Sequence, residues 1–481
     1  MNILILSNNA PNFQHFFGHL AQRLNNDGHQ ISYAVDCEFS SAVNKLGSLP
    51  YELYVFENFF AEHKIDELVL ERYSHVNLNF ALLSDFERAQ IYDIGCSSGL
   101  DFYSRLKSAL LCFFEQIFRK QNTDVILYEP VSNTFAYFAL IVGQSLGINY
   151  CGLGSSRLPG RFSIGSDPFN DNLPCRFFED LQSGKVVGGT QAISWCENYL
   201  SQIDSVVPDY MRSNGLTSTR LWQRYAKVRH LRTIYLLLVY SLRDCQHSFQ
   251  VGLPIRHYFN LVRRNILRRM KLPALNRMYD PVVQSDVFLL YPLHFHPESS
   301  TSILAGAYLN EYEVIRNIAF NLPQGITLYV KDHMAACGFQ QLAFYRKLKD
   351  LPNVRLISYT ADAKQLIRKS VGVITLTSTV GYEALLLGKR VFLFGSVFYE
   401  FHKNVVRVHD PRHLFSLLSE HLLRKVEIDH RYNSIFILAY FLATRAGALD
   451  LTLTNLKAKA MVDSVYAQIC EHLDTLVPAA K

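Results

Sequence analysis

Short apolar strands alternate with helices at both ends of this sequence, and this alternation limits the folds that the chain can adopt. Near the N-terminus, residues 2–6 read as a buried strand, 15–27 as a helix that ends at Gly28, and 30–35 as a second strand. Two more strands are predicted at 124–128 and 149–152. Because parallel strands need a crossover between them, usually a helix, this order predicts a doubly wound parallel sheet.

The same alternation returns in the second half of the chain. The predicted strands are 287–292, 326–331, 354–358, 372–376 and 390–394, and the predicted helices are 302–320, 338–349, 361–369 and 380–387. Helical spacing dominates between the two alternating regions and again after about residue 411. The predicted fold class is therefore α/β, with two Rossmann-like parallel-sheet domains, a helical basic middle section and a helical C-terminal tail.

These boundaries divide the chain into four parts, at 1–165, 166–281, 282–410 and 411–481. Two Rossmann-like halves joined by a helical section are the architecture of GT-B glycosyltransferases and of nucleotide-sugar epimerases. The two classes perform different chemistry on one scaffold, so the fold alone does not decide between them.

Composition excludes several classes of protein. With 481 residues, of which 49% are hydrophobic and 19% charged, the chain can bury more than one core and has no signature of disorder. Its nine cysteines are scattered and form no C-x-x-C pair, which favours reduced thiols and gives no sign of a zinc site. The N-terminal apolar run is too short for a secretory signal, and the longest later run, 234–240, is far below the roughly 20 residues that span a bilayer. We expect a cytoplasmic protein.

One segment of the middle section is strongly basic. Residues 220–277 hold 13 Lys or Arg and one acid, Asp244, so the segment carries 13 − 1 = +12, and the rest of the chain sums to −6 because the whole carries +6. A cationic, aromatic-rich helical segment suits an anionic membrane face or a lipid-linked phosphate acceptor. The alternative is a solvated helical face balanced by acids elsewhere in the fold. Nucleic acid is not an expected partner, because no recognisable nucleic-acid module accompanies the charge.

Polar residues cluster where the predicted strand 372–376 ends. Ser378 and Thr379 supply hydroxyls, and Gly381 lets the backbone come close to a ligand. Glu383, expected in the first turn of the next helix, can accept hydrogen bonds from both hydroxyls of a ribose, while the helix N–H groups form an anion site. The alternative is that a hydroxyl merely caps the helix and Glu383 complements its dipole. The combination at a strand end favours a nucleotide site.

Two further polar clusters follow the first two strands of the second half. His294, His296 and Glu298 point the same way if their segment is extended, and we predict that this dense polar cluster belongs to the donor-nucleotide site. The spacing is weak evidence for a metal, and the alternative is that a histidine near a core is structural. Lys331 and His333 end the next strand, where they could neutralise the phosphate of a leaving group or be ordinary surface residues. We expect no bound metal, because no acid pair with D-x-D spacing stands at a suitable strand end, and no cofactor besides a nucleotide-sugar donor.

The N-terminal half offers a carboxylate and two arginines. Glu129 directly follows the strand 124–128 and can serve as a general base or as a nucleophile at an anomeric carbon. Arg157 and Arg161, within the run GSSRLPGRF, are expected near the same edge of the sheet, where they could hold an acidic sugar. Loop glycines and arginines are common in proteins, so this run alone does not specify a ligand.

Three of these segments resemble a known family. The runs LLYPLHFHPESST, LYVKDHMAACG and VITLTSTVGYEALLLGKRVFLFG, within residues 286–399, are similar to the bacterial capsule polysaccharide biosynthesis family, which includes the Kdo transferases of capsule assembly. In the N-terminal half, only Glu129 and the run RLPGRF are similar to it. The resemblance implies a GT-B fold, a nucleotide-activated sugar such as CMP-Kdo, and work in the cytoplasm at the inner membrane.

The resemblance also implies roles for particular residues. The usual Lys-Glu-His-Pro run of the family falls on Lys331, Asp332, His333 and Met334, so methionine stands where the family has proline. The resemblance implies that His333 meets the donor phosphate, and that the hydroxyl–glycine–glutamate segment after strand 372–376 holds the nucleotide.

The leading hypothesis is a metal-independent GT-B glycosyltransferase of capsule or surface polysaccharide synthesis. It would transfer a sugar, Kdo by the resemblance, from a nucleotide donor to a saccharide or lipid-linked acceptor. Residues 1–165 would form the acceptor-side domain and 282–410 the donor domain, with Glu129 and His333 as catalytic residues. The alternatives are a nucleotide-sugar epimerase or hydrolase on the same scaffold, and a non-catalytic factor of capsule assembly or export.

Overall fold

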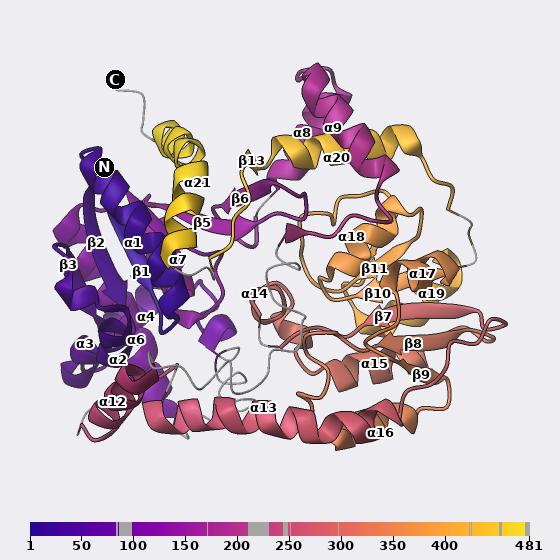
Figure 1. Cartoon of the computed structure of the whole chain (residues 1–481), viewed down its shortest axis with the longest axis horizontal. Coiled ribbons are helices and arrows are strands. Elements are labelled where there is room, and N and C mark those ends of the chain that lie inside the picture. The colour runs from indigo at the N-terminus through magenta and orange to yellow at the C-terminus, as the bar shows by residue number, and fades with distance from the viewer. Residues whose placement is uncertain are drawn as a thin grey trace. The chain divides into compact units, whose positions relative to one another are not determined.

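The structure of this protein, a computed structural model, contains two compact units, each built on its own sheet (Figure 1). Unit 1 comprises Met1–Pro168, Val207–Leu261 and Thr444–Lys481, and unit 2 comprises Phe169–Val206 and Val262–Ala443. The residues that the structure describes are 1–82, 85, 99–170, 172–209, 230–243, 249–250, 252–296, 298–422, 424, 426–451 and 455–476.

Unit 1 is built on a seven-stranded sheet with the order β13-β6-β5-β4-β1-β2-β3. Neighbouring strands from β3 to β5 are parallel, and β6 and β13 join the sheet antiparallel. The strands are β1 (Asn2–Ser7), β2 (Gln30–Val35), β3 (Glu52–Val55), β4 (Val125–Tyr128), β5 (Asn149–Ser155), β6 (Arg161–Gly165) and β13 (Arg445–Ala446). The helices are α1 (Pro11–Asn26), α2 (Glu38–Asn44), α3 (Phe56–Glu62), α4 (Glu67–Arg72), α6 (Leu100–Gln121), α7 (Thr134–Ser145), α12 (His230–Ser241) and α21 (Asn455–Leu476).

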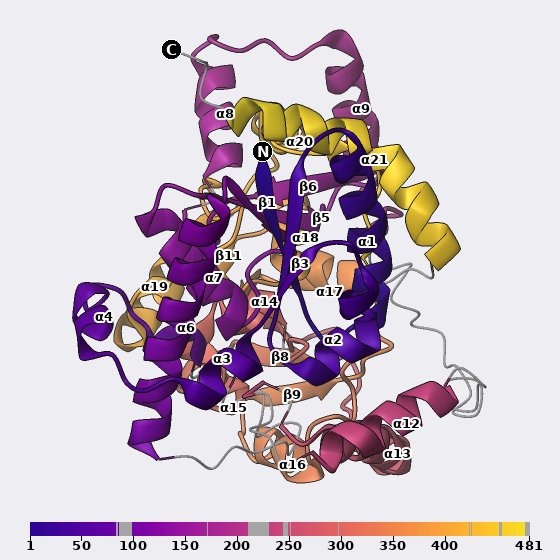
Figure 2. The ribbon, with the colours of Figure 1, turned by 90° about the vertical axis from the view of Figure 1, so that its left-hand side faces the viewer.

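Burial explains the strands that the sequence predicted in unit 1. β4 is buried along its whole length, and β1 and β2 are buried after their first residues, as expected for parallel strands covered on both faces. The C-terminal helix α21 packs along α1 (Figure 2), where the Tyr466 hydroxyl donates to Asp27 Oδ2 at 2.5 Å. The end of the chain thus completes the N-terminal unit.

Unit 2 is built on a six-stranded, fully parallel sheet with the order β12-β11-β10-β7-β8-β9. The strands are β7 (Phe288–Pro292), β8 (Thr327–Lys331), β9 (Val354–Ile357), β10 (Gly372–Thr375), β11 (Val391–Leu393) and β12 (Val405–Arg407). The helices are α8 (Leu173–Gln182), α9 (Thr190–Ser201), α14 (Ser299–Ser302), α15 (Glu311–Phe320), α16 (Leu342–Lys349), α17 (Ala363–Lys369), α18 (Thr379–Leu386), α19 (Leu414–His421) and α20 (His430–Leu442). A further helix, α13 (Pro254–Asn276), spans the boundary between the units in sequence.

The strand order of unit 2 is that of a Rossmann fold. Chain order runs outward from β7 through β8 to β9, then returns to the other side of β7 for β10, β11 and β12. The order of β3-β2-β1-β4-β5 in unit 1 follows the same rule. The predicted α/β class, with a Rossmann-like sheet in each half of the chain and additional helices, is therefore confirmed for each unit.

The predicted helix 302–320 is wrong as a single element. The chain forms the short helix α14, a 3-10 turn at Gly306–Tyr308, and then α15, which begins at Glu311. Asn310 caps α15, because its side chain accepts a hydrogen bond from the Glu313 N–H. This break places Glu311 at the start of a helix instead of in its interior.

The helical middle section predicted at 166–281 is divided between the two units. Residues 169–206 form α8 and α9, which pack on α20 within unit 2, whereas 207–261 belong to unit 1. The predicted tail 411–481 is divided as well, since α19 and α20 belong to unit 2 and α21 to unit 1. Chain order did not reveal this division, because packing between helices far apart in sequence produces it.

The basic segment predicted at 220–277 falls partly outside the described residues, namely at 220–229, 244–248 and 251. Its described part contains α12 and α13. Across the described ranges, no helix has both the length and the apolar character required to span a bilayer.

Gly395, two residues after the end of β11, shows how tightly the strand ends of unit 2 pack. A Cβ at this position would lie 2.7 Å from the Leu304 carbonyl oxygen, 2.9 Å from the Leu376 carbonyl oxygen and 2.6 Å from Thr377 Cγ2. Two of these atoms belong to the backbone and cannot rotate away. Glycine therefore lets the end of β11 approach the end of β10.

We predict that Gly395→Ala destabilises unit 2 by about 1–3 kcal/mol, the usual cost of overpacking a close-packed site. The measurement is urea unfolding followed by Trp195 fluorescence in a Trp222→Phe background, because Trp195 lies in α9 of unit 2. Gly47→Ala is the control, since a Cβ there meets nothing within 4 Å. Equal stability of the two variants would contradict the packing argument.

Candidate functional site

The carboxyl ends of β7 and β10 define the topological switch point of the unit 2 sheet. The chain leaves β7 toward β8 and leaves β10 toward β11, so the two crossovers run to opposite sides of the sheet. In open α/β sheets, ligands bind at this point. The segments that the sequence singled out follow β7, β8 and β10, and thus lie at one edge of one sheet (Figure 1).

Glu311 is the centre of the polar network at this edge. Its Oε1 accepts the His294 backbone N–H at 2.9 Å, the His294 ring at Nδ1 at 2.8 Å, and the Tyr291 hydroxyl at 3.1 Å. Its Oε2 lies 3.3 Å from His296 Nε2. The Glu311 side chain is only 3% exposed, so the carboxylate is held almost entirely by protein groups.

The other nitrogen of His294 connects β7 to β10. His294 Nε2 lies 3.2 Å from the Thr375 hydroxyl and accepts the Thr377 backbone N–H at 3.4 Å. Because Nε2 accepts from an N–H, the neutral ring carries its proton on Nδ1 and donates it to Glu311. One imidazole therefore joins the start of α15 to the end of β10 across the switch point.

The electrostatics of Glu311 follow from these contacts. Burial by itself raises the pKa of the Glu311 carboxyl, but the hydrogen bond from His294 and the adjacent His296 ring outweigh it and hold that pKa below its ordinary value. The carboxylate is thus ionised at neutral pH although it is buried.

The alternation predicted for the segment after β7 is confirmed for the two histidines. His294 and His296 are both buried and both reach Glu311, whereas Glu298 is exposed. Pro297, between them, lies outside the described residues. In the part of the chain that the structure describes, no three His, Cys, Asp or Glu side chains are grouped so that they could hold a metal ion.

Lys331 and Asp332 are built into the end of β8. The Lys331 ammonium donates to the backbone carbonyls of Asp332 at 3.2 Å and Tyr359 at 3.3 Å. Burial lowers the pKa of Lys331. Asp332 accepts the Tyr279 hydroxyl at 2.6 Å and the His333 backbone N–H at 2.7 Å. Burial raises the pKa of Asp332 to about 6. Both side chains shape the turn that presents His333.

His333 differs electrostatically from the cation that the sequence suggested. Burial, together with the positive charges of His294 (when protonated) and Lys331, lowers the pKa of His333 to about 4, so the ring is neutral at pH 7. Its Nδ1 accepts the Ala335 N–H at 3.2 Å, which leaves the ring proton on Nε2. His333 can therefore offer a phosphate a hydrogen-bond donor, and Phe295 lies beside it with ring centroids 6.0 Å apart.

The residues after β10 form the N-terminus of α18. The Ser378 side chain caps the helix by accepting the Val380 N–H at 3.1 Å, as the capping alternative predicts. Ser378 and Thr379 are partly exposed, whereas Gly381 is buried. A Cβ on Gly381 would lie 2.5 Å from the Tyr399 hydroxyl, which donates to the Ser378 carbonyl at 2.7 Å. Packing against Tyr399 thus requires glycine at 381.

Glu383 lies in the second turn of α18, so its predicted place in the first turn is wrong. The helix begins at Thr379, one residue earlier than the sequence indicated. The Glu383 carboxylate lies 3.8 Å from the Lys364 ammonium, and its side chain is 13% exposed. Burial raises the pKa of Glu383, Lys364 lowers it, and Asp362 raises it further.

Lys364 holds a fixed position beside Glu383. Its ammonium donates to the backbone carbonyls of Ile203 at 2.6 Å, Asp204 at 3.2 Å and Val206 at 2.6 Å. These carbonyls follow α9, so the helical segment 169–206 is tied to the edge that carries Glu383.

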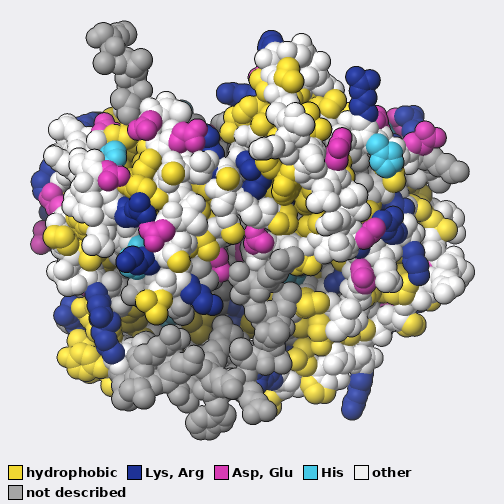
Figure 3. Space-filling view, turned by 45° about the horizontal axis from the view of Figure 1, so that its top comes forward, with side chains coloured by type: hydrophobic (Ala, Val, Ile, Leu, Met, Phe, Trp, Pro, Cys, Tyr) yellow, Lys and Arg dark blue, Asp and Glu magenta, His cyan; other side chains and the backbone are white. Residues whose placement is uncertain are grey.

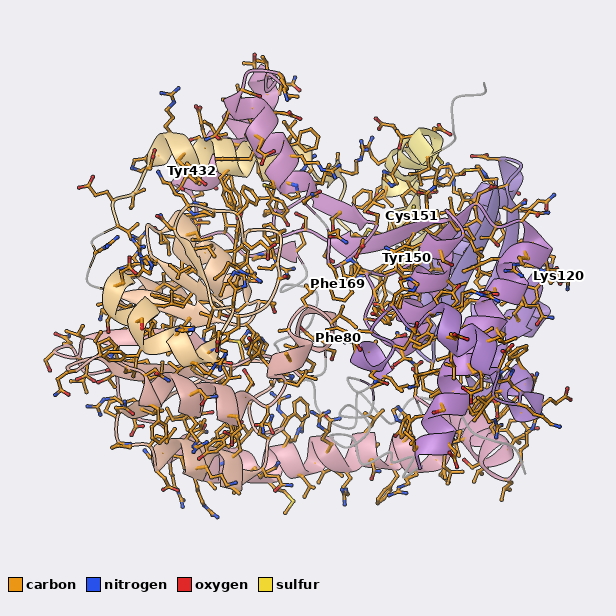
Figure 4. The ribbon with its side chains drawn as sticks, turned by 180° about the vertical axis from the view of Figure 1, so that it is seen from behind. Phe80, Lys120, Tyr150, Cys151, Phe169 and Tyr432 are labelled. Atoms are coloured by element: carbon orange, nitrogen blue, oxygen red, sulfur yellow. The ribbon has the colours of Figure 1, made fainter. Side chains whose placement is uncertain are left out.

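In unit 1, Glu129 lies at the equivalent place, after β4 at the switch point of that sheet. Its Oε1 accepts the Ser132 hydroxyl at 2.8 Å, and its backbone carbonyl accepts the hydroxyl of Tyr150, labelled in Figure 4, at 2.8 Å. The end of β1 contributes Asn8, whose side chain donates to the Tyr128 hydroxyl at 2.6 Å. Glu129 itself is partly exposed.

The two predicted arginines of unit 1 have different surroundings. Arg157 is partly buried in the loop between β5 and β6. Arg161 begins β6, and its guanidinium donates to the Thr444 hydroxyl at 2.7 Å and the Thr444 carbonyl at 2.6 Å. Arg161 therefore anchors the chain where it returns to unit 1, and sugar binding by either arginine stays a prediction.

Sequence reasoning missed Glu311, Lys364 and Asn8. Glu311 lies 17 residues after His294, inside a segment predicted as one helix, and only Asn310 before it signals a helix start. Lys364 lies in an ordinary amphipathic helix, and its backbone partners are about 160 residues away in sequence. Asn8 was available as a polar residue directly after an apolar strand.

Residues 286–403 match the family described as "Capsule polysaccharide biosynthesis protein". This segment covers 403 − 286 + 1 = 118 of the 481 residues, and it contains all of the unit 2 residues described above from His294 to Glu383. The resemblance seen in the sequence is confirmed over this segment. No curated protein sequence matches the chain.

Solved structures align with the chain at low identity. Thermosulfurimonas dismutans KpsC beta Kdo 2,7 transferase is 11% identical, covering 74% of this chain and 90% of that one with a TM-score of 0.37. The KpsC beta Kdo 2,4 transferase of the same organism is 14% identical, covering 67% and 81% with a TM-score of 0.36. UDP-GlcNAc 2-epimerase from Methanocaldococcus jannaschii is 11% identical, covering 92% and 99% with a TM-score of 0.27. TM-scores this low do not establish a common fold. The fold of each unit is therefore assigned from its strand order.

We predict that Glu311→Gln lowers the free energy of unfolding of unit 2 by about 1–3 kcal/mol at pH 7, because buried donors lose a charged acceptor. The pH dependence should change as well. Since the pKa of Glu311 is lowered in the folded protein, its contribution is complete above its ordinary pKa of 4.5 and is lost as the pH falls toward the folded value. The variant should lack this part of the acid destabilisation, measured by urea unfolding at several pH values.

Glu313→Gln is the matched control. Glu313 lies on the same helix, but its side chain is 48% exposed and pairs with Arg316 at the surface. The Glu313→Gln variant should have a free energy of unfolding, and a pH dependence of that free energy, close to those of the parent protein. A similar loss in both variants would show that the network around Glu311 does not hold the edge together.

Proposed function

We propose that this protein is a glycosyltransferase of surface-polysaccharide synthesis that binds a nucleotide-sugar donor at the switch-point edge of unit 2. One observation supports the proposal most strongly. The segment that matches the capsule polysaccharide biosynthesis family, residues 286–403, also contains the polar residues that follow β7, β8 and β10. A nucleotide at this edge would meet the N-terminus of α18.

The donor would be held by groups of three kinds. The hydroxyls of Ser378 and Thr379, at the positive end of the α18 dipole, suit a phosphate, and His333 adds a neutral N–H donor. Glu383, fixed beside Lys364, suits the hydroxyls of a ribose or of the sugar. CMP-Kdo is the donor that we propose, and the acceptor would be a saccharide or a lipid-linked saccharide.

The reaction itself is a substitution at the anomeric carbon. An acceptor hydroxyl oxygen forms the new bond, the bond from the anomeric carbon to the phosphate oxygen breaks, and the nucleotide leaves with that electron pair. His333 and the positive end of the α18 dipole would stabilise the negative charge on the leaving phosphate. Glu129 is the catalytic carboxylate that we propose, receiving the proton of the acceptor hydroxyl if it acts as a base. Arg157 and Arg161 would hold an acidic sugar.

Nucleotide binding tests the donor site. His333→Asn and Glu383→Gln should each weaken binding of CMP about tenfold, the effect of losing one hydrogen bond to a charged group. Titration calorimetry measures the change, after melting-point screening with CMP, UDP, GDP and dTDP has identified the nucleotide that stabilises the protein. His413→Asn and Glu420→Gln are matched controls on exposed residues of the same unit. Unchanged affinity in both site variants would rule out this edge as the nucleotide site.

Transfer activity tests the proposed role of Glu129. Glu129→Gln should reduce transfer of labelled sugar by at least about a hundredfold, as expected for loss of a general base, while CMP affinity stays the same. Glu38→Gln, on α2 of the same unit, is the control. A donor that is consumed equally well without any acceptor would instead identify an epimerase or hydrolase. Capsule formation that persists with the Glu129 variant would identify a non-catalytic factor.

A further inference from the structure

The turn that carries His333 is closed by its own hydrogen bonds. The His333 carbonyl accepts the backbone N–H groups of Ala336 at 3.0 Å and Cys337 at 2.8 Å. The Cys337 thiol donates to the Met334 carbonyl at 3.4 Å. Because these bonds join both ends of the turn, a displacement of Cys337 also displaces His333.

Arg268, on the part of α13 that belongs to unit 2, holds this turn from outside. Its Nε donates to the Cys337 carbonyl at 2.7 Å, and its Nη2 donates to Cys337 Sγ at 3.3 Å. On the face shown in Figure 3, basic and acidic side chains are interspersed, as is usual for surface charges. The Arg268 guanidinium instead directs its donors at the backbone and the thiol of one buried residue.

Gly338 allows α13 to come this close to the turn. Its φ of 77° lies in the left-handed region, which favours glycine. A Cβ at this position would lie 3.2 Å from Arg268 Cγ and 3.3 Å from the Arg268 carbonyl oxygen. The Gly338 N–H donates to the hydroxyl of the buried Tyr345 at 3.1 Å, which fixes the turn from the other side. The backbone of the turn is thus shaped to contact Arg268.

Aromatic rings connect Arg268 to the His333 side chain as well. The guanidinium carbon lies 4.7 Å from the centroid of the Phe339 ring. Phe339 packs edge to face on Phe295, with centroids 6.1 Å apart, and the Phe295 and His333 rings are 6.0 Å apart. The His333 ring is therefore supported by a row of packed side chains while its Nδ1 accepts the Ala335 N–H.

We propose that Arg268 is a positioning residue that fixes the His333 ring in the orientation in which its Nε2–H can meet the donor phosphate. It acts through the Cys337 carbonyl and the Phe339 ring, and it does not itself contact the nucleotide. This inference rests on the proposed function, because it assigns a support to a donor group of that site.

The alternative is that Arg268 contributes only its positive charge. A charge effect would favour any anion and would weaken as salt increases screening. Phe339→Leu separates the two explanations, because it removes a ring on which Arg268 stacks and leaves every charge in place. Positioning predicts that Phe339→Leu and Arg268→Gln have similar effects, whereas a charge effect predicts that only Arg268→Gln has one.

The tautomer of His333 tests positioning directly. In protein with isotopically labelled histidine rings, NMR distinguishes a proton on Nε2 from one on Nδ1, and His333→Asn identifies the signal among the 17 histidines. The parent protein should show only the Nε2–H tautomer of His333 at pH 7, as its contact with Ala335 requires. Arg268→Gln and Phe339→Leu should each show both tautomers.

Titration calorimetry with CMP measures the consequence for the site. Arg268→Gln and Phe339→Leu should each weaken CMP binding about threefold, less than the roughly tenfold loss expected for His333→Asn. In the His333→Asn background, Arg268→Gln should cause no further loss. A residue that acts through His333 cannot add to the effect of removing it.

Arg316→Gln and Phe320→Leu are the matched controls. Arg316 lies over the Phe320 ring on α15 of the same unit, 5.3 Å from its centroid, and Phe320 is 73% exposed. Both controls should match the parent protein in the His333 signal and in CMP affinity, and circular dichroism should show every variant folded.

Three results would overturn the inference: a single His333 tautomer in Arg268→Gln, affinity losses that add in the double variant, or a loss confined to Arg268→Gln with none in Phe339→Leu. Failure of the proposed function gives a different result. In that case His333→Asn leaves CMP affinity unchanged, while Arg268→Gln still mixes the tautomers and so supports its role in orienting the ring.

Discussion

A buried carboxylate holds the switch-point edge of unit 2 together. Glu311, at the first residue of α15, binds the His294 backbone, the His294 ring and the Tyr291 hydroxyl, and it lies beside His296. An ionised carboxylate in a dry site is unfavourable unless its oxygens are all engaged, so these contacts fix one another. Because His294 also reaches the end of β10, the position of the α18 N-terminus depends on Glu311, although Glu311 lies outside the motifs that the sequence presents.

The same dependence extends to the residues around α18. Gly381 and Gly395 are required by Tyr399 and by the backbone at Leu304 and Leu376, so protein atoms occupy the space that glycine leaves. From the sequence, we predicted that the space beside Gly381 would admit a ligand. The partly exposed residues Ser378 and Thr379 therefore remain the ones that we propose for contacts with the nucleotide at this place. A glycine beside a site can serve the site by letting the scaffold pack closely behind it.

Particular residues show what could and could not be predicted. The central strands were predictable because strands buried on both faces read as continuous apolar runs, as in β4, β7 and β10. The edge strands β3 and β12 were missed, since they are only partly buried and lack such runs. The polar ends of β7, β8 and β10 could be placed together by topology alone. The partners of those ends, Glu311 and Lys364, come from tertiary packing that no local spacing encodes.

The charges at the edge determine how an anion could be recognised there. Lys331 lies beside His333 and Lys364 beside Glu383, and both ammonium groups donate to backbone carbonyls. His333 is neutral at pH 7, because burial and nearby positive charge lower its pKa to about 4. A phosphate at this edge would therefore be held mainly by directional N–H and O–H donors instead of by full charges. Donors in fixed positions stabilise negative charge at one place, here the leaving oxygen of the phosphate. A full positive charge would instead attract any anion in solution. A neutral histidine would also gain basicity as a phosphate approaches, because a nearby negative charge raises an imidazole pKa. In the proposed reaction, the edge would thus respond to the charge that appears on the leaving phosphate.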